Sequence, residues 1–402
     1  MTLNCGNCRS LIPSDSIPPQ SNLFSDGRPR LPALSDMTKL ALRMGITAFG
    51  GPAAHIAILR HEAIDRRRWL TERDFLDYLS LANLIPGPNS TELVMHVGAH
   101  QGGRRGLLTA GVAFIGPAAA ITLALAYIYK RWGSSPTAEG ILLGISPALM
   151  VVIAFTLVPL ARATIKSQWA IGLTAALVLL YVSGINELLL LLIGTLVYVA
   201  PHALRALRDH TLALAAPLLL FAIGGDTSQP GAERIFLVFL KIGAVLYGSG
   251  YVLIAFLQRD VVDDRHWITQ QQLLDAVAIG QVTPGPVFST ATFIGYLVGG
   301  WTGAGAATIG IFLPAFVLVW ATHGIAARIR SSASLSLVLD GLNLASNALL
   351  IGVLVTLVRD LDLSILNVLL AAMALIGMAS SRLGPTWILI AAGTVGGLWY
   401  GL

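Results

Sequence analysis

Charged residues and cysteines are both scarce in this sequence. Only 12% of its 402 residues are charged, against roughly 25% in a typical soluble domain, and 55% are hydrophobic. Its two cysteines, Cys5 and Cys8, form one CxxC, and no second cysteine pair is present to complete a zinc site. Together with eight scattered histidines they provide no haem, flavin or iron–sulfur site, so we infer no metal and no cofactor.

Long apolar stretches joined by short polar connections fill most of the chain, and several approach the ~20 residues that a helix needs to cross hydrocarbon. Barrel strands would alternate polar and apolar residues, which these stretches do not do. We therefore predict an all-α, polytopic transmembrane helical bundle in the lipid bilayer. The net charge of +5 is the usual arginine excess at membrane faces, so no nucleic-acid role follows from it.

Residues 1–36 differ from the rest, because Ser, Pro, Asn and Asp dominate there and no apolar core follows a basic start, as a secretory signal requires. We predict a disordered cytoplasmic tail over 1–36.

The remainder contains an internal repeat. A shift of 198 residues places Trp69, Thr71 and Pro86-Gly87-Pro88 on Trp267, Thr269 and Pro284-Gly285-Pro286, and a one-residue gap then carries Gly106 onto Gly303. Chance similarity between apolar segments would match Leu, Ala and Val, whereas Trp, Pro, Gly and Asp match here.

The repeat divides the chain into a first copy at 37–208, a linker helix and loop at 209–232, and a second copy at 233–402. Six apolar segments are expected in each copy, at 38–59, 74–101, 106–130, 139–162, 168–184 and 187–204, and at 235–258, 272–299, 303–328, 334–358, 363–380 and 384–401. An even number of crossings per copy plus one connecting helix, at 211–223, would insert the second copy upside down.

Arginine placement supports this inversion. The loop from Leu59 to Arg73 holds five arginines, whereas its counterpart from Leu257 to Gln271 holds two and three aspartates. Arg104 and Arg105 make the loop after segment 74–101 cytoplasmic as well. Segment 74–101 is therefore expected to be a re-entrant or broken helix that turns at its Pro-Gly-Pro. Segment 38–59 is expected to be re-entrant or broken as well. The amino terminus is then cytoplasmic and the carboxyl terminus periplasmic.

Each Pro-Gly-Pro must interrupt its helix, because proline lacks a backbone N–H and disfavours helix in the residue before it. A helix that restarts after the second proline presents free N–H groups and a positive dipole end, which together bind anions. Polar residues crowd both restarts, and the alternative is a pair of proline kinks that merely bend packed helices. The candidate anion-binding residues here are Asn83, Pro86, Gly87, Pro88, Asn89, Ser90, Thr91, Gln281, Pro284, Gly285, Pro286, Ser289 and Thr290.

Further candidates lie inside the apolar segments. Arg43 and Lys241 are equivalent in the repeat, and each is expected either to bind the anion or to snorkel to the headgroups. Gly50 and Gly51 either interrupt a helix at the site or permit close helix packing. Glu92 and His96 share one helical face and could exchange protons for the anion, unless Glu92 faces a wet vestibule or pairs with an arginine.

Several motifs recur at characteristic spacings: Phe49-Gly50-Gly51-Pro52, Arg-Trp-Leu-Thr ending at Thr71, Pro86 to Glu92, Pro284 to Phe288, and Thr292 to Tyr296. From residue 38 onward they resemble the chromate ion transporter family in its long form with two fused domains. The resemblance implies export of chromate from the bacterial cytoplasm across the inner membrane, driven by the proton gradient and conferring chromate resistance. The second copy departs from the pattern at Ser249-Gly250, where the first has Gly-Pro.

We therefore predict a secondary carrier whose substrate is chromate, with sulfate or another oxyanion and transport by uptake as the alternative. The ATP-binding pattern GxxxxGK[ST] is absent, which argues against direct ATP drive. An enzyme such as a chromate reductase lacks the redox ligands it would need, and a channel would not depend steeply on a proton gradient. Assembly as a homodimer stays open.

Overall fold

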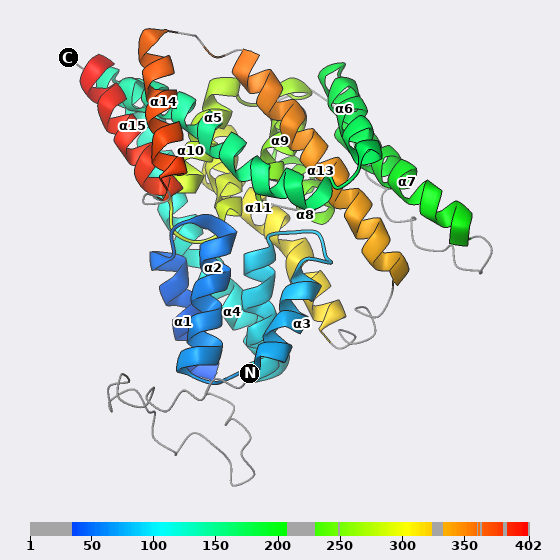
Figure 1. The fold of residues 1–402 in the computed structure, drawn as a ribbon. Coiled ribbons are helices and arrows are strands. Elements are labelled where there is room, and N and C mark those ends of the chain that lie inside the picture. Colours follow the sequence, from blue (N-terminus) through cyan, green and yellow to red (C-terminus); the bar gives the residue numbers. More distant parts are fainter. Residues whose placement is uncertain are drawn as a thin grey trace, which may run out of the picture.

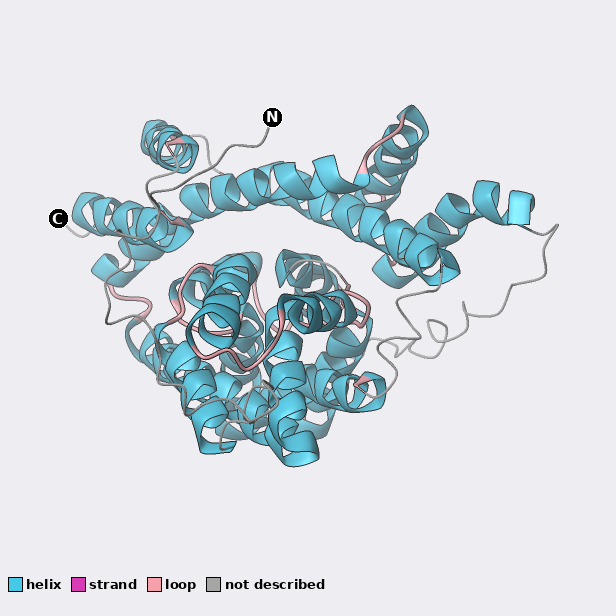
Figure 2. Cartoon of the chain, turned by 60° about the horizontal axis from the view of Figure 1, so that its bottom comes forward, coloured by secondary structure: helices cyan, strands magenta, loops and turns pink. Residues whose placement is uncertain are grey.

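The computed structural model describes residues 34–206, 230–247, 250–323, 333–359, 361, 364–380 and 384–400. These residues form helices and connecting loops, with no strand among them (Figures 1 and 2), so the predicted all-α class is confirmed. Most of the expected cytoplasmic tail with Cys5 and Cys8, the expected helix at 211–223, and Gly248-Ser249 lie outside the described residues.

Equivalent helices follow one another in the same order in the two copies, and the second copy has two additional 3-10 helices, η5 and η7, among the described residues. The first copy comprises α1 (Leu34–Thr47), α2 (Gly51–Arg60), η3 (His61–Arg66), α3 (Glu72–Ala82), α4 (Asn89–Trp132), α5 (Pro136–Thr164), α6 (Gln168–Val182) and α7 (Glu187–Ala206). The second comprises α8 (Ala232–Val245), η5 (Gly250–Val252), α9 (Leu253–Leu257), η6 (Gln258–Asp263), α10 (Gln270–Val282), η7 (Val287–Ser289), α11 (Thr290–Thr322), α13 (Ala333–Arg359), α14 (Ile365–Ala379) and α15 (Pro385–Tyr400). Thr71 and Thr269 begin α3 and α10 with equivalent capping boxes, which explains why this threonine recurs in the repeat.

Both α4 and α11 reverse direction at a pair of glycines. Gly103 has φ +57° and Gly300 has φ +61°, a region that favours glycine. A Cβ added to Gly98 would lie 2.5 Å from the carbonyl oxygen of Gly106, although eight residues span about 12 Å in a straight helix. The chain therefore folds back at each glycine pair, and the two arms pack closely where only glycine fits.

The second arms of α4 and α11 run in opposite directions. Near the beginning of its second arm, α4 places Arg104 over the ring of Trp320, 5.0 Å from the centroid, at the end of α11. At the end of α4, Tyr127 lies 6.2 Å from Trp301, just after the reversal of α11. Equivalent helices that run antiparallel are the arrangement of an inverted repeat, as the arginine pattern indicates.

The copies also interleave. Helix α5 of the first copy packs against α14 and α15 of the second, while α13 packs against α6 and α7 (Figure 1). One apolar core contains buried side chains from both copies. The two sequence modules therefore share an extensive interface.

Four helices within the described residues are long and apolar enough to cross a membrane: Asn89–Trp132, Pro136–Thr164, Val287–Thr322 and Leu337–Arg359. Large apolar side chains also face outward, for example Leu179 at 69% exposed and Ile376 at 70%. Water would not favour such a surface, whereas lipid tails do. The chain is therefore a multi-pass membrane protein.

Candidate functional site

Each Pro-Gly-Pro break is hydrogen-bonded to the other copy. The N–H of Gly87 donates to the carbonyl of Leu246 at 2.9 Å, and the N–H of Gly285 donates to the carbonyl of Ala48 at 3.0 Å. The two donors are 198 residues apart, and so are the two acceptors. Each break is thus placed on the end of the first helix of the opposite copy, α8 or α1, and the pair follows a pseudo-two-fold relation.

The central glycines are required by backbone shape and by space. Gly87 has φ +137° and Gly285 has φ +90°. A Cβ on Gly285 would lie 2.7 Å from the Cβ of Ala118, and one on Gly87 would overlap the Oε1 atom of Glu92. A larger side chain would force the break away from its partner copy.

The predicted polar residues fall into two groups around these breaks. Asn89 donates its side-chain amide to Oδ1 of Asn83 at 2.7 Å, so these two are paired with each other. Ser90 lies 3.2 Å from Nδ1 of His55, and Thr122 donates to Ser289 at 3.1 Å.

Thr91 and Gln281 form the second group, because both are buried beside the breaks. Gln281 accepts from Tyr251 at 3.3 Å, but its Nε2 has no hydrogen-bond partner within the described part of the chain, and neither does Oγ1 of Thr91. Buried polar groups normally have partners, so these two donors are available to a ligand or water.

The break between α1 and α2 has the predicted form. Gly50 and Gly51 have φ values of +104° and +71°, and the carbonyl of Ala48 just before them is the one that accepts from Gly285. Nε2 of His55 lies 3.1 Å from the same carbonyl oxygen. The glycine pair therefore follows directly on the backbone segment that accepts the hydrogen bond from the second Pro-Gly-Pro. Its counterpart, Gly248-Ser249, lies outside the described residues.

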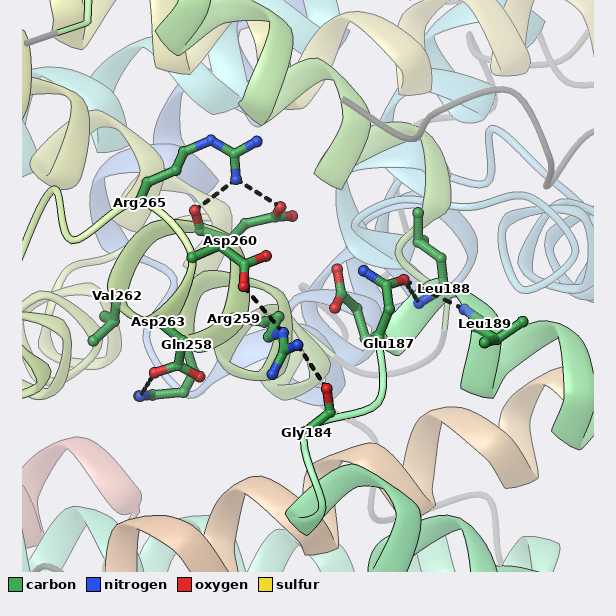
Figure 3. Close-up of polar contacts among 12 residues, drawn as sticks. Gly184, Glu187, Leu188, Leu189, Gln258, Arg259, Asp260, Val262, Asp263 and Arg265 are labelled. Atoms are coloured by element: carbon green, nitrogen blue, oxygen red, sulfur yellow. Dashed lines mark hydrogen bonds and ion pairs between the residues drawn. The ribbon is translucent and has the colours of Figure 1, made fainter. Parts of the chain in front are cut away.

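Lys241 does not reach the breaks, because carboxylates already hold it. Its Nζ lies 2.8 Å from Asp260 and 3.5 Å from Glu187. Arg265 donates to Asp260 at 3.0 Å (Figure 3). The lysine is 4% exposed. A buried cation with two carboxylates is neutralised, so it needs no substrate anion.

Arg43 is held in an equivalent way. It lies 3.4 Å from Glu62, which also pairs with Arg66 and Arg67 at 3.0 Å. Burial acts to raise the pKa of Glu62, but the hydrogen bonds from Arg67 and Arg66 outweigh it and leave this pKa below its usual value. Arg43, Glu62 and Arg67 match Lys241, Asp260 and Arg265 at the 198-residue shift. From this common spacing the carboxylate partners could have been predicted. Because both cations already have carboxylate partners, we remove Arg43 and Lys241 from the proposed anion site.

Glu92 and His96 are both fully buried on the first arm of α4. Neither carboxylate oxygen of Glu92 has a hydrogen-bond partner among the residues described. The His96 ring stacks on Tyr78 of α3, with centroids 5.7 Å apart, and lies 5.8 Å from the ring of His323 at the end of α11. Tyr78 and His323 could not be predicted from the sequence, because their contacts depend on how distant helices pack.

The central residues of both breaks, Pro86, Gly87, Pro284 and Gly285, are buried. Three surface cavities of about 490, 420 and 260 Å³ are lined by other side chains, the largest by Tyr129, Trp267 and Asp275 among others. In this conformation both breaks are covered. Within the described ranges, no group of three or more His, Cys, Asp or Glu side chains is placed to hold a metal ion.

Fold and site together define a polytopic helical membrane protein with two inverted copies and broken helices at their contact. Residues 35–199 and 234–397 both match the chromate transporter family, and the chain belongs to this family.

Three relatives illustrate the similarity. The probable chromate transport protein of Synechococcus elongatus is 30% identical over 90% of this chain and 94% of its own length. The chromate transport protein of Cupriavidus metallidurans is 30% identical over 86% of this chain and 87% of its own, and that of Pseudomonas aeruginosa is 33% identical over 68% and 69%. No solved structure matches the chain.

Proposed function

We propose that this protein is a secondary carrier that exports chromate from the bacterial cytoplasm across the inner membrane, driven by the proton gradient, and so confers chromate resistance. The observation that carries the proposal is the reciprocal pair of hydrogen bonds from Gly87 to Leu246 and from Gly285 to Ala48. Because each break is placed on the other copy, a rotation of one copy against the other changes the surroundings of both breaks at once. Such rocking of inverted repeats is how many carriers alternate access.

Helix starts and neutral donors supply the proposed anion site. The N–H groups at the beginnings of α4 and of η7, which leads into α11, together with Asn89, Thr91, Gln281 and Ser289, can donate to a tetrahedral oxyanion. Thr290 is not among these donors, because its hydroxyl donates to the carbonyl of Val287 at 2.8 Å. No lysine or arginine of the Lys241 and Arg43 clusters takes part, because Lys241 and Arg265 are neutralised by Asp260 and Glu187, and Arg43 is a largely exposed side chain that pairs with Glu62. We propose that the breaks open to water when the copies rock, since they are covered in the present conformation.

A second function, sulfate or chromate uptake together with protons, is favoured by the position of Glu92. Its carboxylate lies against Gly87, so a dianion at the break would be repelled by ionised Glu92. Each pair of unit charges 4 Å apart costs roughly 4 kcal/mol at an effective dielectric constant of about 20. Anion and proton would then bind together rather than in exchange, and protons moving inward would carry the anion with them.

Flux of radiolabelled chromate and sulfate into everted membrane vesicles, with and without a proton gradient, separates these functions. Uptake into everted vesicles that an imposed gradient accelerates corresponds to export in the cell. Accumulation by right-side-out vesicles alone would favour the uptake function. No gradient dependence for either ion would contradict both.

Variants test the site in the same vesicles. Pro86→Ala and Pro284→Ala should lower flux with the protein still inserted, because the break loses its shape. Asn89→Ala should raise the half-saturating chromate concentration about two- to tenfold, as expected for about 0.5–1.5 kcal/mol from one neutral hydrogen bond. Pro159→Ala, an exposed proline inside α5, is the matched control and should leave flux unchanged. Normal flux in all three site variants would refute the assignment.

A further inference from the structure

Three titratable side chains follow one face of the first arm of α4. Glu92, His96 and His100 are spaced by four residues, so their side chains lie one above another on the helix. At 1.5 Å per residue they extend over about 12 Å, from the Pro-Gly-Pro break toward the reversal at Gly102-Gly103.

Two further groups join this row from other helices. Tyr78 of α3 lies parallel to the His96 ring, with an interplanar angle of 8°, and its hydroxyl oxygen is 2.7 Å from Nδ1 of His100. His323, from the second copy, places its Nδ1 atom 3.5 Å from Nδ1 of His96 and its ring 5.6 Å from Tyr78. Tyr78, His96, His100 and His323 thus form a continuous cluster that joins the two copies, and Glu92 lies one helical turn from His96 on the same face.

Burial falls along the cluster from one end to the other. Glu92 and His96 are 0% exposed, whereas Tyr78, His100 and His323 are each partly exposed. Nε2 of His96, like both oxygens of Glu92, has no hydrogen-bond partner in the described ranges. A row of ionisable groups that leads from solvent to unpaired, fully buried atoms is suited to carrying protons inward.

The remaining charged and titratable groups that act on the cluster come from neighbouring helices. Asp74 of α3 interacts electrostatically with Tyr78 and His100, and Tyr247, which follows α8, interacts with Glu92. Arg104 lies near the outer end, where it contacts Trp320 of α11. The exposed end of the cluster therefore lies at the face that carries the arginine-rich loops.

The second copy has no such row. Tyr78 corresponds to Ala276 at the 198-residue shift. Beyond the break the shift is 197, because the Gly102-Gly103 reversal matches Gly299-Gly300, so His96 corresponds to Phe293 and His100 to Leu297. At the same shift Glu92 corresponds to Ser289, which does not ionise.

We infer that Glu92, His96, His100, Tyr78 and His323 form a proton relay between the arginine-rich face and the first Pro-Gly-Pro break. A proton on the His96 imidazolium passes to the carboxylate of Glu92, and His96 is protonated again from His100 or His323. Because His323 belongs to the other copy, rocking changes its distance from His96 and so connects or disconnects the relay. This inference rests on the proposed carrier function, and assigns the proton-coupling part of it to one copy.

The test uses the full-length protein reconstituted in liposomes that contain a fluorescent pH indicator. Chromate counterflow is measured on this preparation as the test of carrier activity. The number of protons moved per chromate is then measured on the same preparation during net chromate flux. The ratio of protons to chromate should fall at least about fivefold in Glu92→Gln and in His96→Asn. His323→Gln, which changes a partly exposed side chain and should fold normally, should lower the same ratio about twofold or more. His61→Asn is the control, because His61 is exposed, lies near the same face and contacts only Asp65 among the interactions described.

The outcomes separate the two proposals. Wild-type liposomes without chromate counterflow would refute the carrier function itself. The relay alone would be refuted if His323→Gln transports chromate with the wild-type ratio of protons to chromate, and if the same holds for each of Glu92→Gln and His96→Asn that still transports. If both of those variants fail to transport, the ratio in His323→Gln decides. A fall of the ratio in His61→Asn equal to that in His323→Gln would also overturn the relay.

Discussion

Replacing Lys241 by methionine should destabilise the protein far more than the same replacement of its counterpart Arg43. Lys241 is 4% exposed and holds Asp260 at 2.8 Å and Glu187 at 3.5 Å. The side chain of Arg43 is 62% exposed and lies 3.4 Å from Glu62. Without the lysine, Glu187 loses its ion pair in the interior, and Asp260 keeps Arg265. Without Arg43, Glu62 keeps two other arginines at the surface.

The expected magnitudes differ several-fold. Removing one partner of a buried ion pair costs roughly 3–5 kcal/mol, whereas an exposed pair contributes about 0–1 kcal/mol. With an unfolding entropy of about 2.1 cal/mol/K per residue, the 402 residues give about 0.84 kcal/mol/K. Lys241→Met should then lower Tm by about 4–6 °C, and Arg43→Met by about 1 °C or less.

Thermal unfolding in detergent, followed by tryptophan fluorescence, measures these shifts, and chromate affinity is measured well below Tm. The double variant Lys241→Met with Glu187→Gln should recover part of the loss, because the unpaired carboxylate is then removed. If Lys241→Met unfolds within 1 °C of the wild type but loses chromate affinity, Lys241 is an anion ligand. The structural role argued for its cluster would then be refuted.

Two further predictions concern the breaks and the topology. Gly87→Ala should abolish transport and lower stability, because its φ of +137° and the Glu92 carboxylate leave no room for a Cβ. Gly172→Ala, on an exposed face of α6, should instead stabilise the protein by about 0.5–1 kcal/mol. Equal thermal shifts in the two variants would contradict this prediction. For the topology, both native cysteines are replaced and single cysteines are introduced at position 73, 105 or 302. Those at Arg73 and Arg105 should react with an impermeant thiol reagent from the same side of the membrane, and that at Thr302 from the opposite side. If the cysteines at Arg73 and Arg105 react from opposite sides, residues 74–101 are a plain span.

Local chemistry explains why much of the fold could be predicted. Proline interrupts a helix wherever it lies, and glycine permits the positive φ of a reversal, so the breaks near Gly50 and Gly87 follow from the sequence. The repeat doubles this information, because any local feature of the first copy is expected again 198 residues later. The capping boxes at Thr71 and Thr269 are an example.

Charged residues show where such reasoning ends. From the sequence, Lys241 is an isolated cation in an apolar segment, and an anionic substrate is one way to neutralise it. The structure pairs it with Asp260, from the π-helix η6, and with Glu187, from the first copy. The repeat could have indicated Asp260, because Glu62 has the same spacing from Arg43. Glu187 has no comparable signal, since its position depends on how α7 packs against the second copy.

The sequence by itself determined the helical class, the duplication, the opposite orientation of the copies and the positions of the breaks, because these depend on composition, periodicity and the backbone limits of proline and glycine. Only the tertiary structure decided which groups meet at the breaks. Gly87 reaches Leu246, and His96 reaches His323, 227 residues away. Contacts over such separations depend on the packing of whole helices, which no local pattern in the chain specifies.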